Sequence, residues 1–234
     1  MTVAAVVLAA SPASALADAD GTPGVRRIAD TAWAGGATPV VVCSADPDAA
    51  VAAVLANSET TLVPPVAPER GPVGQIVNGI EAARRLVTET DAALVWPARL
   101  AWVDAETVTQ LIEAHGSGRG RATVLRPAYG GAAGFPALVP VAHLGTLAAL
   151  AADRMPGELL DDLEAAGVPF AIIDTGDPGV IHDVSVTRAD LPPYDGPPVP
   201  VDAHEHEWGA AGADLPDEMP PTGPVPGATF RSQP

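Results

Sequence analysis

The sequence opens with MTVAAVVLAASPASALADADG at residues 1–21, and the interpretation of this stretch decides the fold. Residues 3–10 form an apolar run, and the ALA at residues 15–17 has the small-residue pattern of a signal-peptidase site. A secretion signal also needs a cationic segment ahead of its apolar run, whereas the first basic residue here is Arg26. The same residues fit a buried first strand followed by a phosphate-binding loop. The rest of the chain has to decide between the two interpretations.

Composition favours an α/β domain with a core of small aliphatic side chains. Apolar residues make up 47% of the 234 residues and aromatic residues only 4%, so Val, Leu, Ile and Ala must fill the core. That core is typical of a buried, mostly parallel sheet. No run reaches the roughly 18 apolar residues needed to cross a bilayer, so we expect a soluble, cytoplasmic protein.

Charge and cysteine content exclude several classes of function. The formal net charge is −17, which would repel nucleic acid and anionic membranes, so neither is expected as a partner. All twelve basic residues are arginine, so no mechanism can depend on a lysine. Cys43 is the only cysteine and cannot form an internal disulfide; we interpret it as a small buried residue at a strand end.

Strand and helix patterns alternate along the chain up to about residue 191. In residues 72–88, for example, the apolar side chains fall on one stripe at helical spacing. Such alternation predicts a doubly wound, mostly parallel sheet with ligands outside the carboxyl ends of its strands. The predicted segments are 3–8, 23–34, 38–43, 46–56, 61–63, 72–88, 92–96, 104–116, 122–125, 137–139, 143–152, 158–166, 170–173 and 180–184, the helix at 104–116 being capped by Asp104.

Residues 192–234 are predicted to be a disordered acidic tail rather than part of this domain, which occupies 1–191. From Tyr194 onward there are seven acidic residues against the single Arg231, with many Pro and Gly. Too little apolar surface remains to offset the entropy of ordering. The HEHE run at 204–207 could bind a metal, but it lacks convergent third and fourth ligands.

Four segments in order resemble the MobA-like nucleotidyltransferases, the family of molybdenum cofactor guanylyltransferase and cytidylyltransferase. They are LAASPASALADADGTPGVRRIADTAWAGGATPVVVC at 8–43, GQIVNGIEAA at 74–83, PAYGGAAGFPALVP at 127–140 and DPGVIHDVSVTRADL at 177–191. The resemblance implies a Rossmann-like nucleotidyltransferase fold, with residues 3–8 as its central first strand. Loss of that strand would remove buried hydrogen bonds, so export with cleavage becomes the lesser alternative.

The same resemblance implies transfer of a nucleotide from an NTP to a phosphorylated acceptor with Mg²⁺. The family loop LAAGxSxRxGxxK supplies an arginine and a lysine, and two aspartates hold the metal. Here Ser11 stands for the first glycine, Ala15 for the arginine and Asp20 for the lysine. The first metal aspartate falls on Arg99, whereas Asp183 of the second block is retained.

We therefore expect the family architecture without its chemistry. The candidate nucleotide-binding residues are Ala9, Ala10, Ser11, Gly79 and Arg99; no catalytic residue is assigned, and only Asp183 remains for a metal. Two interpretations of Arg99 stay open. It could pair directly with an anionic ligand, or it could pair with acidic residues at the start of the following helix, Asp104 or Glu106.

Glycines and tryptophans near these segments also have two interpretations. Gly130, Gly131 and Gly134 could serve turns or approach a substrate. Trp96 and Trp102, on either side of Arg99, could form an aromatic wall for a ligand or simply be buried.

Three functions follow. The first is a catalytically degenerate domain that binds a nucleotide or another anion, or that acts through a protein partner or as a homo-oligomer. The second is an active nucleotidyltransferase, which would use Mg²⁺ to transfer a nucleotide from CTP or GTP to an acceptor such as molybdopterin. The third is a secreted binding protein. The active enzyme requires converging charged groups, for which the candidates are Asp18, Asp20, Asp104, Asp183, Arg26 and Arg27.

Overall fold

The strand β1 (Thr2–Leu8) lies inside the sheet of the computed structural model, which describes residues 1–117 and 121–196. It pairs in parallel with two strands at once; Ala5, for example, lies opposite Val40 on one side and Leu94 on the other. Residues 3–7 are all buried. The opening stretch is therefore a core strand followed by a loop. Most of the predicted tail, including the HEHE run, lies outside the described residues.

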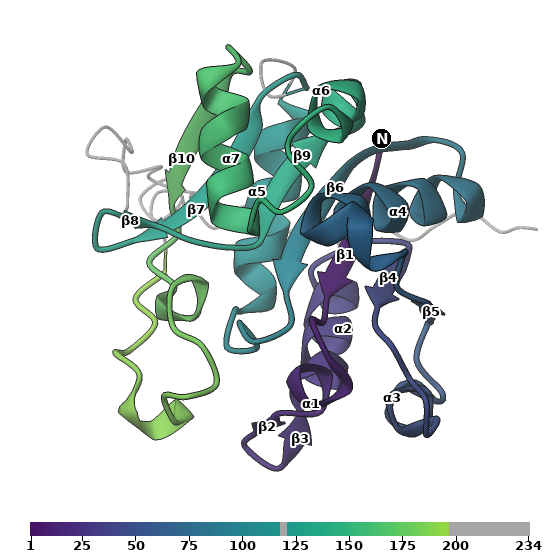
Figure 1. Cartoon of the computed structure of the whole chain (residues 1–234). Helices are drawn as coiled ribbons and strands as arrows, with labels where there is room; N and C mark the ends of the chain where they lie inside the picture. The colour runs from purple at the N-terminus through teal and green to yellow at the C-terminus, as the bar shows by residue number, and fades with distance from the viewer. Residues whose placement is uncertain (118–120, 197–234) are drawn as a thin grey trace, which may run out of the picture. The chain divides into compact units, whose positions relative to one another are not determined.

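Eight strands form the main sheet in the order β10-β7-β9-β6-β1-β4-β5, with β8 paired to β7 (Figure 1). All neighbours are parallel except that β9 runs antiparallel to β6 and β7, and β8 antiparallel to β7. The strands beyond β1 are β4 (Val40–Cys43), β5 (Thr60–Val63), β6 (Thr90–Pro97), β7 (Val124–Tyr129), β8 (Ala132–Ala133), β9 (Ala137–Pro140) and β10 (Phe170–Asp174), and a separate hairpin joins β2 (Asp18–Ala19) to β3 (Thr22–Pro23).

Alternate residues of β1 pack into two separate cores, one on each face of the sheet. Val3, Ala5 and Val7 join the core that contains side chains of α2 (Gly24–Ala34) and α5 (Ala105–Gly116). Ala4 and Val6 join the core of the opposite face. That face carries α4 (Gly71–Leu86), α6 (Leu144–Ala148) and α7 (Pro156–Ala165), which lie in front of the sheet in Figure 1. Helices therefore cover both faces of the sheet, which confirms the predicted doubly wound α/β class.

Three predicted segments differ clearly from the structure, one of them the segment at 143–152, which is observed as the shorter helix α6. The helix predicted at 46–56 is observed as α3 (Ala50–Leu55), because both carboxylate oxygens of Asp46 accept hydrogen bonds from the N–H groups of Val51 and Ala52, at 2.9 Å each. The strand predicted at 180–184 is wrong. Residues Pro178–Val180 form a 3₁₀ turn, and the residues after it are irregular. Between β1 and β2 the structure adds the short helix α1 (Pro12–Ala15).

The segment 177–186 is held against the loop between β6 and α5 by close backbone packing. A Cβ on Gly179 would lie 2.3 Å from the carbonyl carbon of Trp102, and one on Gly134 would lie 2.1 Å from the carbonyl oxygen of Val180. Gly134 therefore serves close approach between chain segments. Gly130 and Gly131 instead have positive φ values of 56° and 83° in the turn between β7 and β8. No helix among residues 1–117 and 121–196 has the length and apolar character of a membrane span.

Candidate functional site

A cavity of about 630 Å³ opens at the carboxyl ends of β1, β4 and β6. The chain leaves β1 for β4 on one side and later returns to place β6 on the other, so the cavity lies where the strand order reverses. Open α/β sheets bind ligands at this point. The lining residues are Leu8, Ala9, Ala10, Ser14, Cys43, Ala45, Pro65, Gly71, Pro72, Gln75, Pro97, Ala98, Arg99, Leu100, Phe135, Met155, Pro156 and Gly157.

The loop after β1 uses its polar groups to close on itself. Ser11 caps α1: its hydroxyl accepts the N–H of Ser14 at 3.2 Å, while the Ser14 hydroxyl accepts the N–H of Ser11 at 3.1 Å. The N–H of Ala9 donates to the carbonyl of Cys43 at 3.0 Å. The N–H groups of Ala9, Ser11 and Ser14 in this loop therefore already have partners within the protein.

Arg99 and Asp183 form an ion pair beside the cavity. The Nη2 and Nε atoms of Arg99 lie 2.8 and 2.9 Å from the same carboxylate oxygen, Oδ2 of Asp183. The arginine side chain is 57% exposed and the aspartate 31%. Neither partner expected from the sequence, Asp104 or Glu106, is the one observed.

Several further contacts fix Asp183. Its other oxygen, Oδ1, accepts the N–H of Ser185 at 2.8 Å and also the Ser185 hydroxyl. The hydrogen bond from the Ser185 hydroxyl is the largest cause that lowers the pKa of Asp183 below its ordinary value, and Arg99 adds to it. The indole N–H of Trp102 donates to the carbonyl of Asp183 at 3.2 Å, and the N–H of Val184 to the carbonyl of Arg99 at 2.9 Å. The carboxylate is therefore charged and held in place.

Asp177 anchors the same segment from a buried position. Its carboxylate accepts the N–H of Asp104, the hydroxyl of Thr107 and the N–H of Gly179, each at 2.8 Å. Burial raises the pKa of Asp177, and these hydrogen bonds oppose the rise. The segment that carries Asp183 is thus tied to the first turn of α5.

The structure brings together only part of the predicted site. Ala9, Ala10 and Arg99 line the cavity, whereas Ser11 and Gly79 do not. Gly79 lies where α4 packs on the sheet: a Cβ there would meet Val6 Cγ1 at 2.3 Å and the sulfur of Cys43 at 2.9 Å. The visible role of Gly79 is close packing.

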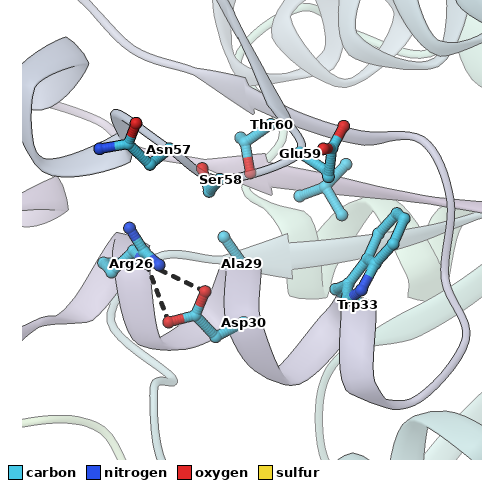
Figure 2. Close-up of a pocket in the computed structure, with 9 residues that line it drawn as sticks. Arg26, Ala29, Asp30, Trp33, Asn57, Ser58, Glu59 and Thr60 are labelled. Carbon is cyan, nitrogen blue, oxygen red and sulfur yellow. Dashed lines mark hydrogen bonds and ion pairs between the residues drawn. The ribbon is translucent and has the colours of Figure 1, made fainter.

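The other charged residues considered for catalysis lie away from the cavity lining. Arg26 pairs with Asp30 one turn along α2 and, as Figure 2 shows, faces a smaller hollow of about 150 Å³. Arg27 lies over the ring of Trp102, 5.2 Å from its centroid, and its Nε donates to the carbonyl of Ala101. Asp104 caps α5, as predicted, by accepting the N–H of Glu106 at 3.0 Å.

Asp18 and Asp20, the remaining candidates, belong to the β2–β3 hairpin. Asp18 accepts the N–H of Gly21 at 3.1 Å, and Asp20 has a positive φ of 60°. Both tryptophans near Arg99 are buried, and neither lines the cavity: Trp96 donates its indole N–H to the carbonyl of Leu100 at 2.8 Å.

Cys43, Gln75, Phe135 and Met155 line the cavity but were not assigned to it from the sequence. The place of Cys43 at the end of β4 and that of Met155 just before α7 could have suggested it, because strand ends and helix starts meet at the carboxyl edge of a parallel sheet. Burial raises the pKa of Cys43 to about 12, so its thiol is protonated and serves as an apolar contact rather than a nucleophile.

The side chains at this site do not provide the ligands needed for the Mg²⁺ that the resemblance implies. The cavity lining includes no Asp or Glu. At the two positions expected for metal carboxylates stand Arg99, which has only hydrogen-bond donors, and Asp183, both of whose oxygens already accept hydrogen bonds. In the described part of the chain, no group of three or more His, Cys, Asp or Glu side chains could hold a metal ion.

The fold and the position of the cavity are those of an α/β domain that binds a ligand at the carboxyl edge of its sheet. Residues 5–166 match the family described as the MobA-like NTP transferase domain, and the chain belongs to that family. A search of curated proteins finds no match to the sequence.

Solved structures with similar folds include three from different organisms. Rv0371c of Mycobacterium tuberculosis H37Rv, in a complex with manganese, is 18% identical with a TM-score of 0.60, covering 78% of this chain and 94% of its own. A 2-C-methyl-D-erythritol 4-phosphate cytidylyltransferase from Thermus thermophilus is 16% identical, with a TM-score of 0.59; the match covers 82% of this chain and 96% of that protein. A nucleotidyl transferase from Methanothermobacter is 18% identical, with a TM-score of 0.58; the match covers 72% of this chain and 85% of that protein. At these identities the likeness establishes the fold.

Proposed function

We propose that this member of the MobA-like family is catalytically degenerate and binds a small anionic ligand through Arg99, without metal-dependent nucleotidyl transfer. The observation that carries the proposal is the Arg99–Asp183 ion pair. The resemblance places two metal-binding carboxylates at these positions, and here the guanidinium takes the place of one of them and binds the other.

The loop after β1 supports the same conclusion. The family loop offers a triphosphate an arginine and a lysine, and here the equivalent positions are Ala15 and Asp20. Each lost charge-assisted hydrogen bond forfeits about 1.5–3 kcal/mol. A carboxylate at the lysine position adds repulsion toward phosphate.

Incubation with CTP, GTP or ATP, with and without Mg²⁺, tests the proposal by measuring pyrophosphate release and the thermal unfolding midpoint. A mixture of phosphorylated acceptors, molybdopterin included, is present in one arm. We expect no pyrophosphate release above the protein-free background and no nucleotide stabilisation that depends on Mg²⁺. Metal-dependent release by the purified protein would establish the alternative, an active nucleotidyltransferase.

A further inference from the structure

The cavity beside Arg99 is lined almost entirely by side chains that form no strong hydrogen bonds. Only Ser14, Gln75 and Arg99 carry a polar group, apart from the protonated thiol of Cys43. Its volume of about 630 Å³ falls within the roughly 300–1,000 Å³ of small-molecule sites. Four prolines from different elements stiffen the wall, which preorganises it for a ligand: Pro65, Pro72, Pro97 and Pro156.

All three polar side chains are wholly or partly used within the protein, Ser14 and Gln75 by the loops around them. The hydroxyl of Ser14 donates to the carbonyl of Ser11 at 2.8 Å while accepting that residue's N–H. The Oε1 atom of Gln75 accepts the N–H of Val66 at 3.3 Å, and this contact fixes the orientation of the amide. What remains for a ligand is the NH₂ group of Gln75, a donor.

Arg99 also presents donors. Its Nε and Nη2 atoms both face Oδ2 of Asp183, so that edge of the guanidinium is occupied. The edge formed by Nη1 and Nη2 has no other partner within the described residues. A guanidinium edge of this kind matches one carboxylate through two parallel hydrogen bonds. Asp183 thus holds the guanidinium in place and leaves its second fork open.

We propose that the cavity binds a small monocarboxylate with an apolar body rather than a nucleotide; this proposal rests on the proposed function above. The apolar wall takes the body, and the free edge of Arg99, with the amide of Gln75, takes the carboxylate. A triphosphate is a poor match. The lining provides one cation for its several charges, and Asp183 already neutralises part of that cation.

Calorimetric titration of the full-length protein with two carboxylates and their neutral amides tests the proposal. The probes are 2-naphthoate against 2-naphthamide and octanoate against octanamide, with CTP in the absence of Mg²⁺ as the nucleotide arm. We expect each carboxylate to bind at least about tenfold more tightly than its amide, since the charge-assisted pair is lost in the amide. CTP without metal should bind more weakly than either carboxylate.

Single-residue variants distinguish the contribution of Arg99 to binding from that of the apolar cavity wall. Arg99→Leu should remove the preference for carboxylate over amide, and Asp183→Asn should strengthen carboxylate binding because it unmasks the charge of Arg99. The matched control is Arg26→Gln, which breaks the Arg26–Asp30 ion pair on α2 (Figure 2) and should leave binding unchanged. If Arg99→Leu fails to unfold cooperatively, Arg99→Lys replaces it; it keeps the charge but loses the fork, and should weaken carboxylate binding.

Three results would overturn this inference while leaving the proposed function standing. They are no binding of either carboxylate, equal affinity for acid and amide, and preferential binding of metal-free CTP. Release of pyrophosphate with Mg²⁺ is a different failure, because it overturns the proposed function itself.

Discussion

Arg99 and Asp183 are 84 residues apart in the sequence, yet one oxygen of the aspartate lies 2.8 Å from Nη2 and 2.9 Å from Nε of the arginine. The pair joins the end of β6 to the segment that follows β10. The carboxylate of Asp183 could help to bind a metal cation, but here it pairs with the guanidinium of Arg99, a cation that belongs to the chain itself. The electrostatic requirement of Asp183 is met without an external ion.

Arg99→Asp should create a response to Mg²⁺ that the natural protein lacks. The change places a second carboxylate opposite Asp183, and two like charges about 4 Å apart repel by about 1–4 kcal/mol, depending on the local dielectric. We expect a lower thermal unfolding midpoint without divalent ions and partial recovery in millimolar Mg²⁺, measured by calorimetry. Arg99→Asn, which adds no charge, is the control. An equal Mg²⁺ response in the natural protein, the Asn variant and the Asp variant contradicts this prediction.

Asp183 and Asp177 should have opposite effects on how the free energy of unfolding changes as the pH falls. Hydrogen bonds from Ser185, with Arg99, lower the folded-state pKa of Asp183, so its contribution is present above the unfolded pKa of about 3.9 and is lost as pH falls through the folded value. Burial raises the folded-state pKa of Asp177, so the stability that this residue contributes is present at low pH and is lost as the pH rises through that folded-state pKa.

The free energy of unfolding, measured with urea at several pH values between about 3 and 6, checks this pair of signs. Asp183→Asn should make the loss of stability toward acid shallower, and Asp177→Asn should make it steeper. The comparison concerns slopes with pH, so a uniform destabilisation of either variant does not disturb it. Slopes that change in the same direction in both variants would refute the assignment.

Gly79→Ala should destabilise the protein even when no ligand is present. The added Cβ meets Val6 at 2.3 Å and Cys43 at 2.9 Å, so α4 must move away from the sheet at a cost of about 1–3 kcal/mol. Gly145→Ala in α6 is the matched control: no atom lies within 4 Å of its added Cβ, and alanine there should be neutral or gain up to about 1 kcal/mol. Equal urea midpoints for the two variants would count against a packing role for Gly79.

Local spacing predicted most of the fold. The apolar stripe at 72–88 became α4 at residues 71–86, and Asp104 caps α5 as expected. Errors arose where tertiary contacts overrode local pattern. The apolar residues from Val180 to Val184 resemble a strand, but Val180 enters the core from a 3₁₀ turn, and Gly179 fits under the backbone of Trp102. No local pattern reveals that contact.

The candidate site was only partly predictable for the same reason. Arg99 could be singled out because a cation stood where the resemblance places an aspartate. Its partner could not, since local reasoning favoured the nearby Asp104 and Glu106. Gly79 matched a family pattern, but whether a glycine serves a ligand or a helix contact depends on the distance between α4 and β1.

The match to the family ends at residue 166, whereas β10 and the Asp183 segment come after it. A fragment cut at that boundary would lose an edge strand and the counter-charge of Arg99 together. Arg99, which lines the cavity, would then lack the carboxylate that neutralises part of its charge. Residues 167–196 therefore belong in any minimal version of this domain, because they supply both an edge strand of the sheet and the carboxylate that pairs with Arg99.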